Sequence, residues 1–590
     1  MLGKRSEQRG FLEGDHLYLD YVGRQSFYGF LASLRGQLFE DEELAKLYCP
    51  DNGRNSVPPS LLATALLLQA HDKVSDEEAK MRADFDIRWK VALGIEVEDR
   101  PFAKSTLQVF RAQLILHEKV RAVFQRSLRY ARETGYLKGR KMKAALDTTY
   151  ILGRGAVKDT YNLLADGMVQ VVKVLAQLEG VCPKDWAERH GFESFFGSSM
   201  KAEAGIDWDN EKERRALLGR IVADADRVLE LARQAQGRCP KESLERKGIV
   251  EAAELLGQLL LQDVERKEDG PALKEGVSRD RIPSVHDPEM RHGRKSSSTK
   301  FDGHKAAVVV DTDFQLIAAV GVLPGNAPDN TRALELVEQS EANSGVNVEE
   351  TIADCAFGDG ATRQAFADAG RTLIAKVAAR RHKEHFAKED FRIDLEAATC
   401  TCPAGVVTQV KQRLKSHPGG EGGWQRPWGF VFPATVCGAC ALRPKCVASK
   451  KGKGRTVSLH PQEGLLQQAR AFQHSEAFTE YRKRRQASEH RLARLVQLGI
   501  RHARYFGRAK TLFQVFLAAT VANLTLVASK LGMMGRVADP AVCSPAGRKH
   551  RVPWASIIVV PMMFFLTAVS LSCWAAPRPS FRKAGFRLGF

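Results

Sequence analysis

The sequence has few cysteines for its length and no apolar segment near its N-terminus. Its 590 residues include 11 Cys, and an odd number leaves at least one thiol without a disulfide partner. This excludes a secreted scaffold held together by disulfides. Because residues 1–16 contain no apolar run, we expect no signal peptide and a cytoplasmic protein with reduced thiols.

Acidic residues are also in deficit. The chain has 70 Asp and Glu against 89 Lys and Arg, a formal net charge of +19. Such a surplus indicates a polyanionic partner, with nucleic acid first and an anionic membrane surface second. The 44% hydrophobic and 27% charged residues are typical of a globular protein. Because single cores stop growing at about 250–300 residues, we expect several domains or one domain with large insertions.

The first 140 residues predict an all-helical domain. An apolar run from Leu61 to Ala70 follows two prolines, which a helix tolerates in its first turn. Ser105 and Thr106 indicate a cap before another amphipathic stretch. Short helices joined by tight turns favour a helix-turn-helix-like DNA-binding domain over 1–140, in which Arg111 contacts DNA. An ordinary helical packing domain would explain the same periodicity.

Residues 141–535 predict a mixed α/β core. Five strand-like runs are separated by helices and turns, at 142–152, 306–311, 315–323, 350–354 and 372–377. Two insertions interrupt the core, a helical one at about 160–275 and a loop-rich, Cys-bearing one at about 380–455. A helix resumes at about 461 and runs to 531, with one break near Gly507.

Three carboxylates are candidates for phosphodiester chemistry. Asp147 and Asp354 follow apolar strand residues, and Glu489 lies on a late helix. Two Mg²⁺ ions about 3.5–4 Å apart need such groups converging from separate elements. Taken alone, an Asp after a strand is more often a turn or cap residue. Asp311 and Asp313 are rival candidates, but they fit a hairpin turn better.

Glu489 lies four residues after Arg485, so the two side chains share one helix face. The common outcome for such a pair is a solvated ion pair. Here, however, four further arginines and one lysine between 482 and 494 surround a single acid. Such a run repels itself unless a polyanion neutralises it, and DNA would do so.

Five motifs follow one another along the chain: Leu-Asp147-Thr-Thr, Phe-Asp-Gly303-His-Lys305-Ala, Ala-Asp354-Cys-Ala-Phe-Gly, Arg485-x₃-Glu489 and Gly499-x₂-His-Ala-Arg504-Tyr-Phe-Gly507. In this order the sequence resembles bacterial insertion-sequence transposases with an Asp-Asp-Glu (DDE) catalytic domain. The resemblance is closest to insertion-sequence family number 1182 and covers residues from about 50 to 530.

The resemblance implies a ribonuclease-H-like mixed five-stranded sheet. Asp147 would lie on its first strand, Asp354 after its fourth, and Glu489 on the helix behind the second insertion. These acids would hold two Mg²⁺ or Mn²⁺ ions. The protein would cut DNA at the ends of an insertion sequence and join them to target DNA by strand transfer. It would act as a homodimer on DNA in the nucleoid, without a small-molecule substrate.

Basic residues near the acids are expected to bind DNA phosphates. The candidates are Arg485, Lys305, Arg291, Lys295, Arg504 and Arg111. A disordered basic loop is an equal alternative for Arg291 and Lys295. Relatives often carry a Tyr, Arg, Glu, Lys signature around the third acid. Here the tyrosine is shifted to Tyr481 and Val496 replaces the lysine.

Five of the cysteines lie between 400 and 446. Cys402, Cys437, Cys440 and Cys446 are the predicted ligands of a structural Zn²⁺, and Cys400 is the spare thiol. An iron–sulfur cluster or free thiols are the alternatives. Cys355, next to Asp354, is expected to be a small buried residue.

The last segment, 536–590, is a tail with an uncharged apolar stretch at 552–577. This stretch is long enough to span a bilayer, but Pro561 interrupts it. Transposases of this kind carry no membrane anchor, so we expect a packed or poorly ordered extension and no membrane role. Two other interpretations of the whole chain are a non-catalytic DNA-binding protein, such as a decayed transposase occupying inverted repeats, and a basic membrane-anchored protein.

Overall fold

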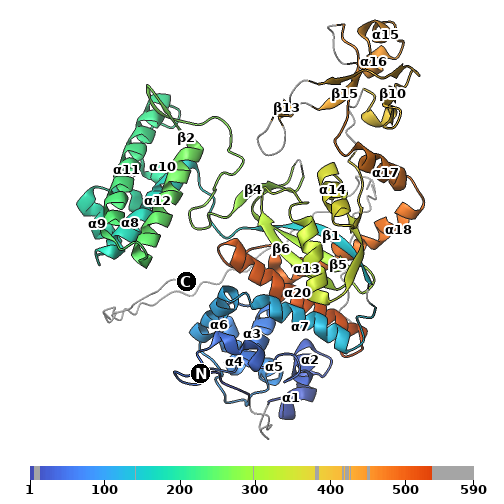
Figure 1. Cartoon of the computed structure of the whole chain (residues 1–590). Coiled ribbons are helices and arrows are strands. Elements are labelled where there is room, and N and C mark those ends of the chain that lie inside the picture. The colour runs from blue at the N-terminus through green and yellow to red at the C-terminus, as the bar shows by residue number, and fades with distance from the viewer. Residues whose placement is uncertain are drawn as a thin grey trace, which may run out of the picture. The chain divides into compact units, whose positions relative to one another are not determined.

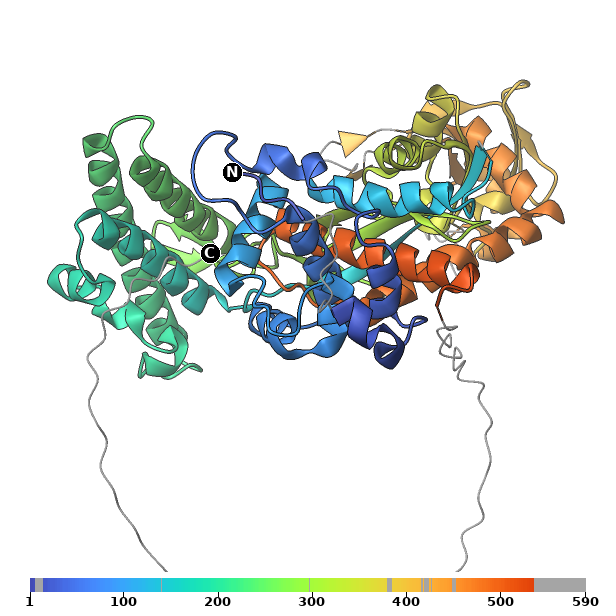
Figure 2. The ribbon, with the colours of Figure 1, turned by 90° about the horizontal axis from the view of Figure 1, so that it is seen from below.

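The structure is a computed structural model, shown in Figures 1 and 2. It describes residues 1–5, 14–139, 141–296, 298–378, 385–414, 417–418, 424–425, 427–447 and 452–534. The apolar tail expected at 536–590 therefore lies outside the described residues.

The N-terminal part is helical, as predicted. Its helices are α1 (Gly14–Val22), α2 (Phe27–Ser33), α3 (Pro59–Asp72), α4 (Asp76–Phe85), α5 (Ile87–Leu93), α6 (Lys104–Leu116) and α7 (Val120–Glu133), with a 3₁₀ turn at Glu42–Leu47. Local sequence sets their starts, since Ser75 caps α4 and Asp86 caps α5 through side-chain oxygens.

Six strands between residues 141 and 374 form a mixed sheet (Figure 1). Its strands are β1 (Lys141–Leu152), β4 (Arg291–Arg294), β5 (Lys300–Asp311), β6 (Ile317–Pro324), β7 (Asn347–Ala353) and β8 (Thr372–Ile374). All five predicted strands are present as β1, β5, β6, β7 and β8, and the short β4 is the sixth. β5 is antiparallel to β1, β4 and β6, whereas β7 is parallel to β1 and β8.

The turn between β5 and β6 has the form predicted for Asp311. Its Oδ1 accepts hydrogen bonds from the backbone N–H groups of Asp313 (2.9 Å) and Phe314 (3.1 Å). At the other end of β5, Gly303 has a φ of 150°, and a Cβ there would lie 2.2 Å from the Ile151 carbonyl oxygen. The Asp-Gly-His motif therefore needs glycine for close strand pairing.

Two helices bury the sheet's apolar side chains. α13 (Ala333–Ser344) packs on β6, and α20 (Arg508–Lys530) packs on both β6 and α7 (Figures 1 and 2). Asn523 of α20 is fully buried and bonds both the N–H and the C=O of Ile317 at 2.9 Å. α20 is the one helix of the described residues that is long and apolar enough to cross a membrane, and 89% of its most apolar window is buried inside the protein.

The first insertion is a helical bundle with its own core. It comprises α8 (Thr160–Leu178), α9 (Pro183–His190), α10 (Met200–Glu203), α11 (Glu211–Arg238) and α12 (Leu244–Asp263), with a 3₁₀ turn at Glu193–Phe196. Its last part was expected to be helical to about 275, and this is wrong. Residues Val264–Lys267 and Gly270–Leu273 form the hairpin β2–β3, because Gly270 adopts a φ of 111°, which a helix cannot contain.

The second insertion consists of short strands around a small core. Its strands are β9 (Arg392–Asp394), β10 (Thr399–Thr401), β11 (Val407–Thr408), β12 (Lys411–Arg413), β13 (His417–Pro418), β14 (Trp424–Gln425), β15 (Trp428–Val431) and β16 (Thr456–Ser458). Two short helices, α15 (Ala434–Gly438) and α16 (Arg443–Cys446), carry Cys437 and Cys446, and Cys440 lies between them. Five buried residues form the core, namely Phe391, Cys400, Phe430, Phe432 and Val457.

The C-terminal helical region is more broken than predicted. It contains α17 (Glu463–Gln473), α18 (Ala477–Arg484), α19 (Gln486–Leu495), a π-helical turn (Val496–Ile500) and α20. The break at Gly507 is confirmed, since its φ is 85°. A second glycine, Gly499, has a φ of 93° and ends the regular helix before His502.

Candidate catalytic site

Asp147 lies in the middle of β1, which pairs with β5 on one side and with β7 on the other. Its cross-strand partner on β5 is Val308, and β7 pairs with the preceding residues up to Leu146. The residue is 9% exposed, and its Oδ1 accepts a hydrogen bond from the Thr148 N–H at 2.8 Å. The strand thus holds one carboxylate rigidly at the surface of the sheet.

Helix α19 packs on β1 and β5 and brings a second acid to this face. Arg485, at the junction of α18 and α19, donates to Asp147 Oδ2 at 3.3 Å and also forms an ion pair with Glu489. Ser488 is fully buried, and its hydroxyl donates to Asp147 Oδ2 at 3.4 Å. The Arg485 guanidinium therefore bridges the two acids.

Asp354 directly follows β7, the strand parallel to β1. Its Oδ1 accepts from the Ala356 N–H at 2.8 Å, and its charge acts on Asp147. The charge of Lys295, which follows β4, acts on Asp147 as well. The expectation that Cys355 is buried is wrong: this thiol is exposed, in the 3₁₀ turn Cys355–Phe357 that follows Asp354.

The pKa of Asp147 is raised above its usual value. Burial is the main cause, and the negative charge of Asp354 raises it further. The Thr148 N–H and the charges of Arg485 and Lys295 act in the opposite direction. Two carboxylates crowded in this way favour a cation beside them.

In the structure, the carboxylates of the three candidate acids do not surround a common point. Among the described residues, no group of three or more His, Cys, Asp or Glu side chains is arranged to hold a metal ion. The cation beside Asp147 and Glu489 is instead the Arg485 guanidinium. Binding of a metal ion by both acids requires Arg485 to release at least one of these contacts.

Two other basic residues that were expected to bind DNA, Lys305 and Arg291, make hydrogen bonds within the protein instead. Lys305 on β5 donates to the Ala327 carbonyl and to Asp329, both at 2.7 Å. Arg291 on β4 is half-buried and donates to the Met290 carbonyl at 2.7 Å, and burial lowers its pKa. Lys295 is exposed.

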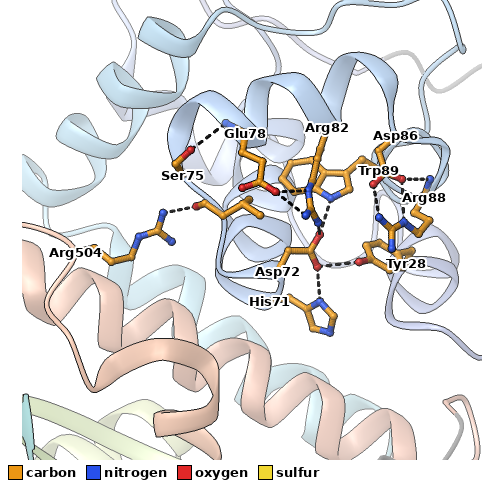
Figure 3. Close-up of polar contacts among 11 residues, drawn as sticks. Tyr28, His71, Asp72, Ser75, Glu78, Arg82, Asp86, Arg88, Trp89 and Arg504 are labelled. Carbon is orange, nitrogen blue, oxygen red and sulfur yellow. Dashed lines mark hydrogen bonds and ion pairs between the residues drawn. The ribbon is translucent and has the colours of Figure 1, made fainter. Parts of the chain in front are cut away.

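Arg504 and Arg111 join the N-terminal helices to the C-terminal segment. Arg504 donates to the backbone carbonyl of Val74 (Figure 3). Arg111 on α6 forms a 2.5 Å ion pair with Asp76, and its guanidinium lies 5.0 Å from the Tyr505 ring centre. The Arg111 side chain is 9% exposed, so this conformation buries it away from any DNA.

The four predicted zinc ligands border one cavity, but in the described part of the chain they are not arranged as a metal-holding group. Cys402, Cys437, Cys440 and Cys446 line a cavity of about 30 Å³. Burial raises the pKa of the Cys446 thiol, and the other three thiols act on it electrostatically. Cys400, the predicted spare, is fully buried in the small core instead.

The sequence alone did not single out Ser488 or Glu350. Ser488 is three residues after Arg485, a spacing that places both on one helix face and could have revealed it. Glu350 on β7 accepts from the Tyr481 hydroxyl at 2.8 Å and pairs with Lys143 at 3.0 Å. The shifted Tyr481 therefore contacts a neighbouring cluster on this side of the sheet.

Two transposase family models match the chain. A model described as "Transposase domain (DUF772)" matches residues 20–113, and one described as "Transposase DDE domain" matches residues 401–528. The first match covers the N-terminal helices. The second begins in the Cys-bearing insertion and continues through Glu489 into α20.

No curated protein matches the chain, and no solved structure does. The two matches come in the order along the chain that the motifs predict, and both describe the same class of protein. They support the assignment of this chain as a transposase of a mobile insertion sequence, whose partner is DNA.

Proposed function

We propose that this chain cuts DNA at the ends of its insertion sequence and joins them to target DNA, with Asp147, Asp354 and Glu489 as the catalytic carboxylates. The observation that supports the proposal is that the three acids come from adjoining elements, namely β1, the end of β7, which pairs with β1, and α19, which packs on β1. Arg485 contacts Asp147 and Glu489 together, and the charge of Asp354 reaches Asp147.

The chemistry of these groups fits divalent metal ions. Hard carboxylate oxygens are the ligands that Mg²⁺ and Mn²⁺ prefer, and the raised pKa of Asp147 reflects crowded negative charge. When bound, two such ions activate the attacking oxygen and stabilise the leaving oxygen of an in-line displacement. DDE transposase domains generally use divalent ions, which favours the same assignment.

The remaining residues of the site have positioning roles in this proposal. Ser488 and the Thr148 N–H orient the Asp147 carboxylate. Arg485, once released from an acid, is placed to neutralise a phosphate oxygen at the same point. Lys295 is exposed and close enough to Asp147 to act on its charge, so it would hold the DNA strand beside the acids.

The strand order supports a ribonuclease-H-like fold. The sheet runs β6–β5–β1–β7–β8, with the first three strands antiparallel and the last two parallel to β1. We place the chain in insertion-sequence family number 1182 because its ordered motifs resemble those of that family. Joining two ends implies that it works as a homodimer on DNA.

A structural Zn²⁺ in the Cys-bearing insertion is part of this proposal. Four thiols, one following β10 and three from the α15–α16 segment, line one small cavity, and thiolates are soft ligands suited to Zn²⁺. The core beside them has only five buried residues. A metal bound there would hold together a segment that buries little apolar surface.

The test is cleavage of DNA that carries the element's end, with Mg²⁺ or Mn²⁺, by the parent and by Asp147→Asn, Asp354→Asn and Glu489→Gln. Each variant keeps the side chain's shape and removes its charge. We expect loss of cutting by at least about a hundredfold, with DNA binding retained. Asp313→Asn, on the exposed β5–β6 turn, is the matched control and should cut normally.

Equal cutting by the parent and Asp147→Asn would refute the catalytic assignment. Specific binding of the ends by a parent chain that never cuts would favour the alternative, a decayed transposase that only occupies inverted repeats.

A further inference from the structure

A cavity of about 400 Å³ lies between the N-terminal helices and the C-terminal helical region. One wall comes from the end of α3 and the residues before α4, including Ala70, Lys73 and Ser75. The other wall comes from residues 498–518, in the π-helical turn, the loop after it and α20. The first wall lies in the segment matched by the DUF772 transposase model, and the second lies in the segment matched by the DDE model. The cavity therefore forms where the two transposase segments meet.

The interior of this cavity is apolar. Four buried apolar side chains line it, namely Leu498, Phe513, Leu517 and Ala518. Gln514 lines it as well, but its amide is used within the wall. Its Nε2 donates to the carbonyls of Gly499 at 3.1 Å and His502 at 3.0 Å, and its Oε1 accepts from the Arg504 N–H at 2.9 Å. The interior thus offers apolar surface, and Gln514 holds the loop 499–504 in place.

The residues that line the solvent-facing part of the cavity are basic. Lys73 and His502 are exposed, and the Lys73 side chain lies beside Gly499. Arg504 donates to the Val74 carbonyl, a bond that leaves its charge uncancelled (Figure 3). Within the part of the chain that the structure describes, none of these three basic side chains forms an ion pair, and no Asp or Glu lines the cavity. The charge therefore favours an anionic ligand.

Two elements run from the proposed catalytic acids to this cavity. β1 continues from Asp147 to Leu152, whose backbone pairs with His502, over a length of about 17 Å. α19 and the π-helical turn continue from Glu489 to Leu498, about 14 Å at the rise of a helix. The cavity thus lies within the length of about five stacked nucleotides from the acids.

We propose that this cavity binds one unpaired nucleotide of the DNA strand, with the base in the apolar interior and its phosphate at Lys73, His502 and Arg504. We call it the junction cavity. A free phosphate would use only the basic residues, whereas a nucleotide matches both the apolar interior and the charge. The volume is sufficient, since pockets for small ligands begin at about 300 Å³. The inference rests on the proposed function, because its ligand belongs to the strand that the acids would cut.

The test measures binding of the full-length protein to labelled single strands by fluorescence anisotropy, without divalent metal so that no cutting occurs. One strand is an oligothymidine of about twelve nucleotides, and the other is an abasic strand of the same length that keeps every phosphate. We expect the parent to bind the base-bearing strand at least about fivefold more tightly, which is the low end of what one buried base contributes.

Two variants address the two halves of the junction cavity. Ala70→Trp fills the interior from α3, so it should abolish the preference for the base-bearing strand and leave the affinity for the abasic strand near that of the parent. Lys73→Asn removes a charge and places a residue that tolerates the φ of 59° at this position. It should weaken the binding of both strands alike and reduce the slope of log K against log salt by about 0.7.

The matched control is Arg332→Asn. Arg332 also has a positive φ, 60°, but it does not line the junction cavity and it pairs with Glu335. Its salt slope and its preference for the base-bearing strand should equal those of the parent. Lys73→Arg keeps the charge at the cavity and should bind like the parent.

Equal binding of the two strands by the parent would overturn the inference, as would an undiminished preference in Ala70→Trp. An unchanged salt slope in Lys73→Asn, or an equal fall in Arg332→Asn, would overturn it too. These slopes decide the question even if the melting temperature shows that Ala70→Trp does not fold. Failure of the catalytic proposal is distinguishable, because the parent would then prefer the base-bearing strand without cutting DNA, whereas failure of this inference leaves cutting by Asp147 intact.

Discussion

Asp72 at the end of α3 organises the N-terminal helices, and its removal has a calculable effect. Its side chain is only 4% exposed. It accepts hydrogen bonds from the Tyr28 hydroxyl and Trp89 Nε1, each at 2.8 Å, pairs with Arg82 at 2.7 Å and lies 2.8 Å from His71 Nδ1 (Figure 3). One carboxylate thus joins α2, α4 and α5 to the end of α3.

Burial alone would raise the pKa of Asp72, but the hydrogen bonds outweigh it and lower the pKa from 3.8 to about 2. At about 1.4 kcal/mol per pKa unit, this difference corresponds to about 2 kcal/mol. Because the folded-state pKa is below the unfolded one, this stability is complete above the unfolded value. It is lost as the pH falls through about 2.

The perturbation is Asp72→Asn, which keeps the shape but removes the charge. We expect the free energy of opening of α3 to α5, measured by hydrogen exchange of peptides from residues 59–93, to fall by about 2 kcal/mol at pH 6. The difference from the parent should shrink as the pH falls from about 4 to 2. The control is Asp20→Asn, whose pair with Arg24 is exposed and should contribute little.

Two results would refute this reasoning. One is unchanged exchange of α3 to α5 in Asp72→Asn at pH 6. The other is a loss that stays constant with pH, since it would come from packing and not from the charge.

Three further predictions concern other parts of the chain. Arg111→Met should lower the melting temperature, because it leaves a buried acid without its cation, yet leave DNA affinity unchanged by anisotropy; a loss of affinity in a stably folded variant would restore Arg111 as a DNA contact. Gly303→Ala should destabilise the protein by more than about 2 kcal/mol or prevent folding, whereas Gly257→Ala, with open space around it in α12, should be neutral or stabilising in thermal melts. Elemental analysis of purified protein should find one zinc per chain, lost in Cys437→Ser and kept in the exposed Cys182→Ser; an equal zinc content in both would exclude the cysteine site.

Local sequence determined most of the secondary structure. The strands at 142–152, 306–311 and 315–323 were predictable because apolar, β-branched runs end at turn residues, and the Asp311 turn followed from its own side-chain chemistry. The four-residue spacing of Arg485 and Glu489 was enough to place both on one helix face, and the structure contains the ion pair that such a spacing commonly gives. Cysteine spacing predicted a Zn²⁺ site, and the four thiols line one cavity without being arranged to hold a metal ion.

Only the tertiary structure decided which charged residues face the protein and which face solvent. From the sequence, Arg111 was as good a candidate for a DNA contact as the other basic residues. In the structure, Asp76 and Tyr505 enclose it, and Tyr505 is nearly four hundred residues away along the chain. Cys355 follows a buried strand and is nevertheless exposed, because it begins the 3₁₀ turn after Asp354, in which Phe357 is the buried side chain. The net charge of +19 follows directly from the sequence, whereas the positions of the charged side chains in the folded protein do not. Charge is a sum over the sequence, but its availability to DNA depends on partners that folding brings from distant segments.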